Sequence, residues 1–188
     1  MRFWAALLAG KIVAFFCRLF RHPGTSLPGA VALKICPQLL SILAPAYEQV
    51  VAVTGTNGKT TTANLIAHIL RSSNISAANN YEGANMITGV ATALIKDCTL
   101  RGKARSQVAI LEVDEGSVRK VFPATKPDLV VVTNYFRDQL DRYSELNHNI
   151  TLLHRVLTEL PKTSLLLNAD DPLVVTAGRD QSAVSYYG

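Results

Sequence analysis

One short segment restricts the fold of this chain more than any other. A β-branched run, residues 50–54 (VVAVT), leads directly into the glycine-containing loop 55–62 (GTNGKTTT). A helical pattern then follows as far as Arg71. A strand, a glycine loop, Lys-Thr and a helix in this order are the context that a phosphate-binding loop (P-loop) requires. The segment therefore predicts an α/β fold in which a buried strand delivers this loop to the edge of a sheet.

The residue types in the loop suit a nucleoside triphosphate. Gly55 and Gly58 allow backbone N–H groups to approach phosphate oxygens, and the helix that follows adds the positive end of its dipole. Lys59 supplies a point charge to the β and γ phosphates, which makes it the candidate catalytic residue, and the Thr60 hydroxyl can ligate Mg²⁺. Val53 stands where the general pattern GxxxxGK[ST] has its first glycine. The alternative is a Gly-Lys-Thr turn that binds no ligand.

Further buried strands are expected at residues 107–113, 127–133, 163–167 and 182–187. We expect them to join the first strand in a doubly wound, mostly parallel sheet, whose ligands meet the carboxyl ends of the strands. Glu112, at the end of the strand 107–113, is the candidate to complete a Mg²⁺ shell begun by Thr60. Asp114 and Glu115 are better explained as the acidic start of a helix over 115–122.

Two other strand ends carry polar residues. Asn134 and the cluster 137–141 (RDQLD) follow the strand 127–133, and they either line the site or form a self-capping turn. Asn168 follows the strand 163–167, and its amide offers the donor and acceptor that an adenine edge needs. The same Asn-Ala-Asp-Asp-Pro segment is also a good turn and helix start.

The charge of the chain is concentrated at one end. Of 19 Lys+Arg and 14 Asp+Glu, residues 1–47 hold five positive and no negative side chains, so residues 48–188 hold 14 of each sign. A basic arm beside a neutral body points to an anionic surface or partner and does not favour nucleic acid. We therefore divide the chain into a basic apolar arm with a Pro/Gly-containing linker (1–47) and an ATP-binding domain (48–188).

The arm allows more than one interpretation. Residues 3–20 are apolar but interrupted by Lys11 and Arg18. The uncharged stretches between these charges are too short to span a bilayer. The arm could lie as a helix of residues 1–21 against anionic lipid, or pack on its own domain with the basic stems extended along the surface. A signal peptide is opposed by Lys11 and by the ATP site. We expect a loop at 22–29 and one short helix over 30–43, broken near Pro37.

The cysteines indicate neither a disulfide framework nor a zinc site. Cys17, Cys36 and Cys98 are odd in number, widely spaced and without a CxxC pair. We expect them to be buried and inert in a reducing compartment.

Four motifs in order, VTGTNGKTTT (53–62), LEVDE (111–115), TNYFRDQLDRY (133–143) and LNADDP (167–172), resemble the central ATPase domain of the Mur ligase family over residues 48–188. The resemblance implies ATP and Mg²⁺ binding by Gly55, Thr56, Asn57, Gly58, Lys59, Thr60 and Thr61, a Mg²⁺ role for Glu112 and an adenine contact for Asn168. It also implies that a carboxylate is activated as an acyl phosphate and then attacked by an amine.

Within the family, the segments GTSLPG (24–29), NYEGAN (80–85) and RDQLD (137–141) are similar to the members that amidate lipid II. Many other members have a histidine at the position of Gln139. The similarity implies amidation of the D-glutamate α-carboxylate, with ammonia from a GatD-like glutaminase in a heterodimer, at the cytoplasmic side of the membrane. Such members continue into a four-cysteine zinc ribbon and a C-terminal domain, so we expect this chain to be an incomplete and inactive part. The alternatives are a folylpolyglutamate synthase-like or other Mur-type amide ligase, and a non-catalytic nucleotide-binding module.

Overall fold

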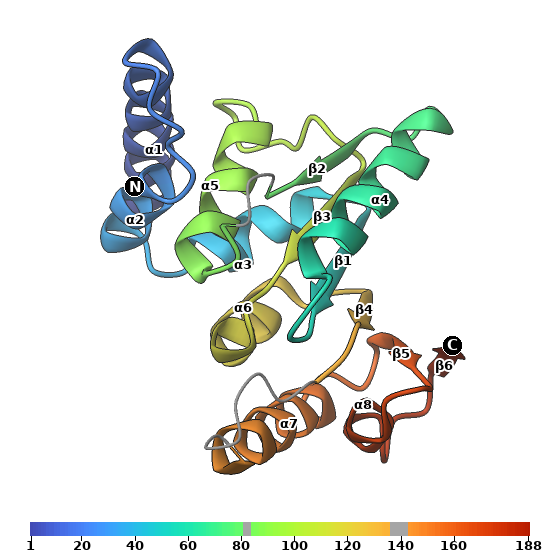
Figure 1. Cartoon of the computed structure of the whole chain (residues 1–188). Helices are drawn as coiled ribbons and strands as arrows, with labels where there is room; N and C mark the ends of the chain where they lie inside the picture. The colour runs from blue at the N-terminus through green and yellow to red at the C-terminus, as the bar shows by residue number, and fades with distance from the viewer. Residues whose placement is uncertain (81–83, 136–142) are drawn as a thin grey trace.

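A parallel β-sheet forms the centre of the molecule (Figure 1). The computed structural model describes residues 1–80, 84–135 and 143–188, and for 143–148 it describes the backbone alone. The six described strands have the order β2-β3-β1-β4-β5-β6, and every neighbouring pair is parallel. Their bounds are β1 Gln49–Thr54, β2 Ala77–Asn79, β3 Val108–Glu112, β4 Leu129–Val132, β5 Ser164–Asn168 and β6 Val184–Tyr187. The predicted doubly wound parallel sheet is confirmed.

The central strands are hydrophobic because both of their faces are covered. Nearly every residue of β1, β3 and β4 is buried, which is the pattern of a parallel sheet between two layers of helices. Strand β1 pairs with β3 on one side and with β4 on the other, and Val53 is in register with Glu112. Val53 is fully buried in the core between the sheet and α4. The position where the general P-loop pattern has a glycine is thus an ordinary core position here.

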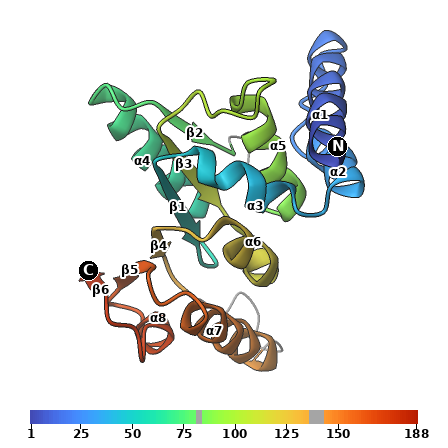
Figure 2. The ribbon, with the colours of Figure 1, turned by 180° about the vertical axis from the view of Figure 1, so that it is seen from behind.

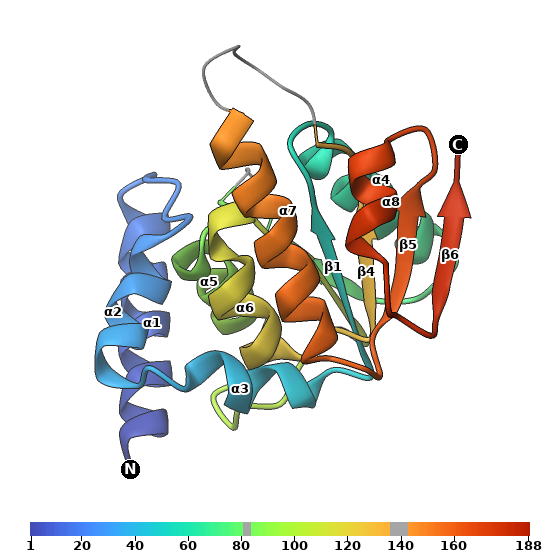
Figure 3. The same cartoon turned by 90° about the horizontal axis from the view of Figure 1, so that it is seen from below.

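Helices cover the two faces unequally (Figures 2 and 3). One face is covered by α4 (Lys59–Ser72), whose Ala63 and Ala67 pack against β1, β3 and β4. The other face is covered by α5 (Ile87–Asp97), α6 (Val118–Thr125), α7 (Tyr143–Thr158) and the short α8 (Pro172–Ala177). A 3₁₀ turn, η2 (Glu115–Ser117), precedes α6.

The N-terminal region consists of three helices and a 3₁₀ turn: α1 (Arg2–Leu19), α2 (Leu27–Ile35), α3 (Leu39–Leu43) and η1 (Ala44–Ala46). The expected loop at 22–29 ends early, because α2 begins at Leu27 with Pro28 in its first turn, where the missing N–H is not needed. The expected break near Pro37 is confirmed, because residues 36–38 separate α2 from α3. These helices belong to the same hydrophobic core as the sheet, through residues such as Leu7, Ala32 and Leu40.

Helix α1 is held on the domain by its inner face. Ala6, Leu7, Gly10 and Cys17 are buried there, and a Cβ added to Gly10 would lie 2.9 Å from Ile95 Cδ1. The Nζ of Lys11 donates to the carbonyl oxygen of Ile95 at 2.8 Å and also to that of Cys98, at the C-terminal end of α5. Of the two alternatives for this segment, packing on its own domain therefore holds for the inner face of α1.

Two sequence expectations about the N-terminal part can be compared with the structure directly. Cys17, Cys36 and Cys98 are free and buried, as expected. Among the described residues no individual helix has the length and apolarity needed to cross a bilayer. The segments Leu27–Ile35 and Leu39–Ala46, which are bent relative to each other, meet these two criteria only when they are counted as one segment.

Candidate nucleotide-binding site

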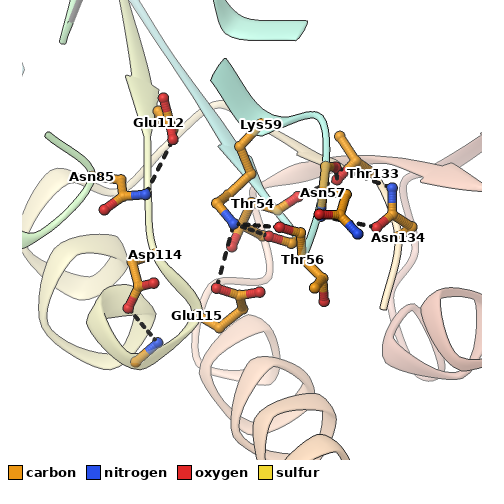
Figure 4. A network of polar contacts seen from close by, with 12 residues as sticks. Thr54, Thr56, Asn57, Lys59, Asn85, Glu112, Asp114, Glu115, Thr133 and Asn134 are labelled. Carbon is orange, nitrogen blue, oxygen red and sulfur yellow. Dashed lines mark hydrogen bonds and ion pairs between the residues drawn. The ribbon is translucent and has the colours of Figure 1, made fainter. Parts of the chain in front are cut away.

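The P-loop connects the C-terminal end of β1 to the N-terminus of α4 (Figure 4). Gly58 is the N-cap of α4, with a φ of 81°, and no side chain caps the helix. The first backbone N–H groups of a helix have no acceptor within it, and Thr62 is the first residue here whose N–H bonds back, to Gly58 at 2.9 Å. The N–H groups just before it are oriented for an anion, with the helix dipole behind them.

The two residues that follow β4 hold the loop in place. Gly55 has a φ of 127°, and a Cβ added to it would lie 2.3 Å from Thr133 Oγ1. The backbone N–H of Thr56 donates to the carbonyl oxygen of Asn134 at 2.7 Å, and that of Asn57 donates to Asn134 Oδ1 at 3.0 Å. Asn134 Nδ2 and Thr133 Oγ1 donate in return to the carbonyl oxygen of Asn57, at 3.0 and 2.8 Å. Asn134 therefore lies at the loop as expected, whereas the part played by Thr133 was not anticipated.

The lysine of the loop is folded back over it. Lys59 Nζ donates to the carbonyl oxygens of Gly55 and, at 2.9 Å, of Thr56. It also forms an ion pair with Glu115 Oε2 at 3.5 Å, and both side chains are largely buried. Figure 4 shows the two side chains pointing toward each other from different segments. Burial raises the pKa of the Glu115 carboxyl, and the charge of Lys59 opposes this shift only in part.

The acidic segment after β3 thus has two roles. Asp114 caps η2 by accepting from the N–H of Gly116 at 3.1 Å, so its expected place at a helix start is confirmed. Glu115 begins the same turn but also pairs with Lys59. This ion pair was not expected from the sequence. No local pattern could have revealed this pair, because the two residues are 56 positions apart in the chain.

Glu112 lies at the end of β3, next to the end of β1. Its side chain is 3% exposed, and its Oε1 accepts from Asn85 Nδ2 at 3.1 Å. Asn80 fixes the backbone of the same residue, since its amide donates to Glu112 O at 2.7 Å and accepts from Glu112 N at 2.8 Å. Both asparagines belong to the segment NYEGAN (80–85), of which 81–83 lie outside the described residues. The segment could have been linked to Glu112 only through the fold.

The residues present fit a nucleotide with its metal. Thr54 Oγ1, at the base of the loop, is buried without a hydrogen-bond partner among the described residues. Thr60 is exposed in the first turn of α4. Within the described ranges no three His, Cys, Asp or Glu side chains are grouped to hold a metal on their own. Mg²⁺ that binds with a nucleotide is commonly held by one or two protein oxygens together with substrate phosphates.

Asn168 lies at the same edge of the sheet, at the end of β5. Its Nδ2 donates to the carbonyl oxygen of Thr133 at 2.9 Å, and its Oδ1 accepts from the N–H of Asp170 at 2.9 Å. One amide hydrogen and one lone pair are left for a further partner. Asp171 caps α8 and accepts from the N–H of Tyr135 at 2.6 Å, so the expected turn and helix start are confirmed.

The predicted cluster 137–141, which includes Gln139, lies outside the described residues. The site that the structure describes is therefore made by the ends of β1, β3, β4 and β5.

Comparison with known proteins gives this geometry a context. Residues 53–188 match the family described as "Mur ligase middle domain". The chain is 38% identical over 188 residues to the lipid II isoglutaminyl synthase (glutamine-hydrolyzing) subunit MurT of Staphylococcus aureus, covering 100% of this chain and 42% of that protein. It is 41% identical over 168 residues to the MurT subunit of Streptococcus pneumoniae, covering 89% and 36%. The chain thus spans about two fifths of these curated relatives.

Solved structures agree on the fold. MurF from Acinetobacter baumannii has a TM-score of 0.68 at 17% identity, over 84% of this chain and 34% of that one. MurF from Thermotoga maritima in complex with ADP has a TM-score of 0.64 at 17% identity, over 84% and 36%. FolC from Escherichia coli in complex with DHPP and ADP has a TM-score of 0.54 at 17% identity, over 79% and 46%. With the family match extending from the P-loop strand to Gly188, the chain belongs to the Mur ligase family, and residues 53–188 are its middle domain.

Proposed function

We propose that this chain is the nucleotide-binding part of an ATP-dependent amide ligase subunit that amidates the D-glutamate α-carboxylate of lipid II to D-isoglutamine in peptidoglycan biosynthesis. The observation that supports it most is the P-loop at the end of β1, with Glu115 and Glu112 beside it, in a chain similar over its whole length to MurT. The name of that relative includes lipid II and the hydrolysis of glutamine.

The proposed reaction has two steps. A carboxylate oxygen attacks the γ-phosphorus of ATP, the bond to the bridging oxygen breaks, and ADP leaves with the electron pair. Ammonia then attacks the carbonyl carbon of the acyl phosphate, inorganic phosphate leaves, and a proton is lost from nitrogen. The phosphoryl step requires charge neutralisation and positioning more than covalent help from the protein.

The residues of the loop have distinct tasks in this proposal. Lys59 exchanges its carbonyl and Glu115 partners for the β and γ phosphates, so its charge meets the negative charge that develops on transfer. The backbone from Gly55 to Thr61 surrounds the phosphates, with Thr56 and Asn57 held by Asn134. Mg²⁺, held by Thr60 and Glu112, would supply Lewis-acid stabilisation of the phosphates. Asn168 uses its remaining donor and acceptor for adenine.

Ammonia requires a source, and we propose a glutaminase subunit of the GatD type in a heterodimer with this protein. The relatives are described as subunits of a glutamine-hydrolysing synthase, which supports this assignment. The zinc ribbon expected in full-length relatives is part of the same proposal. The three cysteines of this chain are free and separately buried, so we do not assign them as its ligands. We further propose that the reaction takes place on the cytoplasmic side of the membrane.

The test is amidation by the complete protein that carries residues 1–188, incubated with its glutaminase, glutamine, ATP, Mg²⁺ and lipid II. Mass spectrometry should detect the decrease in the mass of lipid II that accompanies replacement of a carboxyl hydroxyl by an amino group. Lys59→Ala should abolish both ATP turnover and amidation with an unchanged circular dichroism spectrum. Lys162→Ala, at an exposed lysine outside the loop, is the matched control and should be fully active.

Two results would contradict the proposal. Modification of a folate or a UDP-muramyl peptide, with lipid II left unchanged, would assign the chain to a different amide ligase of the same fold. ATP binding by a complete protein that amidates none of these substrates would make it a non-catalytic nucleotide-binding module.

A further inference from the structure

The outer face of α1 is apolar and largely exposed. Trp4, Leu8, Phe15 and Leu19 are each more than half exposed, and Ile12 and Phe16 are only slightly less so. These side chains recur every three or four residues and form one stripe, opposite the face that packs on α2 and α5. Figures 1 and 3 place α1 at the end of the molecule farthest from β6. From Trp4 to Leu19 the stripe extends over about 22 Å of the helix.

A basic cavity adjoins this stripe. Its volume is about 600 Å³, and Phe15 of the stripe forms part of its wall. Cations reach it from three segments: Lys11 and Arg18 on α1, Lys96 on α5 and Arg105 before β3, with His22 close by. Lys11 is already engaged by backbone carbonyls, so Arg18, Lys96 and Arg105 provide the available charge. None of these three forms an ion pair with a carboxylate of the described residues.

Asp97, the last residue of α5, is a carboxylate close to this cavity, and no side chain of the three available cations binds it. Asp97 accepts from Tyr47 Oη at 2.9 Å and from Ser106 Oγ at 2.7 Å, as well as from two backbone N–H groups. Residues 1–47 contain no Asp or Glu at all. An occupant of this surface must therefore present anionic groups next to an extended apolar layer. Phospholipid headgroups above their acyl chains have that combination, and a helix with this pattern lies in the membrane interface.

We infer that the α1 stripe and the adjoining basic cavity form one docking site for an anionic phospholipid membrane. Trp4, Leu8, Phe15 and Leu19 enter the acyl boundary, while Arg18, Lys96 and Arg105 bind lipid phosphates. Two of these three cations come from the folded domain, so the site exists only when α1 is docked on α5. The inference does not depend on ligase activity, and its test requires no nucleotide.

Trp4 is the only tryptophan among the 188 residues, so the fluorescence of this chain reports directly on the stripe. The chain is mixed with vesicles of phosphatidylcholine alone or of phosphatidylcholine with phosphatidylglycerol. Its tryptophan emission should shift to the blue only with the anionic vesicles. The protein should also sediment with those vesicles, and each cation changed to Gln should weaken binding about fivefold.

Matched variants separate the two halves of the site. Phe15→Ser/Leu19→Ser should abolish sedimentation, whereas Leu65→Ser/Ile69→Ser, at equally exposed positions on α4, should leave it unchanged. Arg18→Gln/Lys96→Gln/Arg105→Gln should reduce it strongly, whereas Arg119→Gln/Lys120→Gln/Arg179→Gln, at exposed positions elsewhere, should not.

Several outcomes would overturn the inference. Equal binding by both charge variants would remove the basic cavity from the site, and failure of the wild-type protein to sediment would remove the membrane. A wild-type dimer that Phe15→Ser/Leu19→Ser converts to a monomer, without vesicle binding, would make the stripe a contact between copies. Capture of the glutaminase through the stripe, again without vesicle binding, would make it a protein interface.

Discussion

Lys59 Nζ lies 3.5 Å from Glu115 Oε2, so the cation of the P-loop is paired with a carboxylate from the segment that follows β3. The same nitrogen also donates to two carbonyl oxygens of its own loop. A triphosphate that binds here must replace these partners, and it must approach the negative charge of Glu115.

Glu115→Gln should therefore strengthen ATP binding. The substitution removes the competing charge and keeps the shape of the side chain. We expect an increase in affinity of roughly fivefold, the scale of a partly screened ion pair. Titration calorimetry with Mg²⁺-ATP measures it, and Asp114→Asn is the matched control, because Asp114 caps Gly116 and does not contact Lys59. Weaker binding by Glu115→Gln would instead assign Glu115 to the metal shell.

The raised pKa of Glu115 also predicts how stability depends on pH. Burial raises this pKa above the ordinary 4.5, so the folded protein holds the proton more tightly than the unfolded chain does. The resulting stabilisation is complete below pH 4.5 and is lost as the pH rises through the raised pKa. Glu115→Gln lacks this contribution, so the unfolding free energy of the wild type, relative to the variant, should fall as the pH rises from 4.5. Urea unfolding of both proteins over this range measures the difference, and a constant or rising difference would contradict the assignment.

The two glycines of the loop should respond differently to alanine. At Gly58 the φ of 81° is unfavourable for alanine, but nothing lies within 4 Å of the added Cβ, so we expect a loss of about 1–2 kcal/mol in unfolding free energy. At Gly55 the φ of 127° is combined with a Cβ only 2.3 Å from Thr133 Oγ1 and 2.8 Å from the backbone oxygen of Asn134. The clash adds roughly 1–3 kcal/mol to the conformational cost. Denaturant unfolding of the two variants gives the comparison, and equal losses would show that the close approach of Thr133 and Asn134 is not important.

Features of the fold that depend on neighbouring residues could be predicted from the sequence. Residues 49–72 carry the strand, the loop and the helix as one continuous signal, and the β-branched runs identified β3 and β4 in the same way. Strand β2 was missed because it has only three residues, Ala77–Asn79, without a β-branched run. Helix α5 was missed because its N-cap, Met86, forms no side-chain cap and gives no start signal.

The same distinction between neighbouring and distant residues applies to the candidate site. The P-loop glycines, Lys59 and Thr60 form a contiguous motif and could be assigned without a structure. The contacts of Lys59 with Glu115, and of Glu112 with Asn85, join segments that only the sheet order brings together. The same holds for Arg18, Lys96 and Arg105, whose shared cavity exists because α1 packs on α5.

The metal role of Glu112 can be tested separately from its place in the fold. Glu112→Gln keeps an oxygen for the bond from Asn85 Nδ2, so the buried contact at 3.1 Å can survive the change. The substitution removes the negative charge that Mg²⁺ prefers in a ligand. We therefore expect the unfolding free energy and the ATP affinity without Mg²⁺ to change little. Added Mg²⁺ increases the ATP affinity of the wild type, and in the variant this increase should be smaller by at least about tenfold.

Calorimetry with and without Mg²⁺ measures this gain directly. Glu48→Gln is the matched control, because Glu48 is exposed at the opposite end of β1 from the loop. An undiminished Mg²⁺ gain in Glu112→Gln would exclude this carboxylate from the metal shell. In that case Glu112 would act only by holding Asn85, and Asn85→Ala should then reproduce every property of Glu112→Gln. If Glu112 binds the metal as proposed, Asn85→Ala should keep most of the Mg²⁺ gain, because the carboxylate is still present.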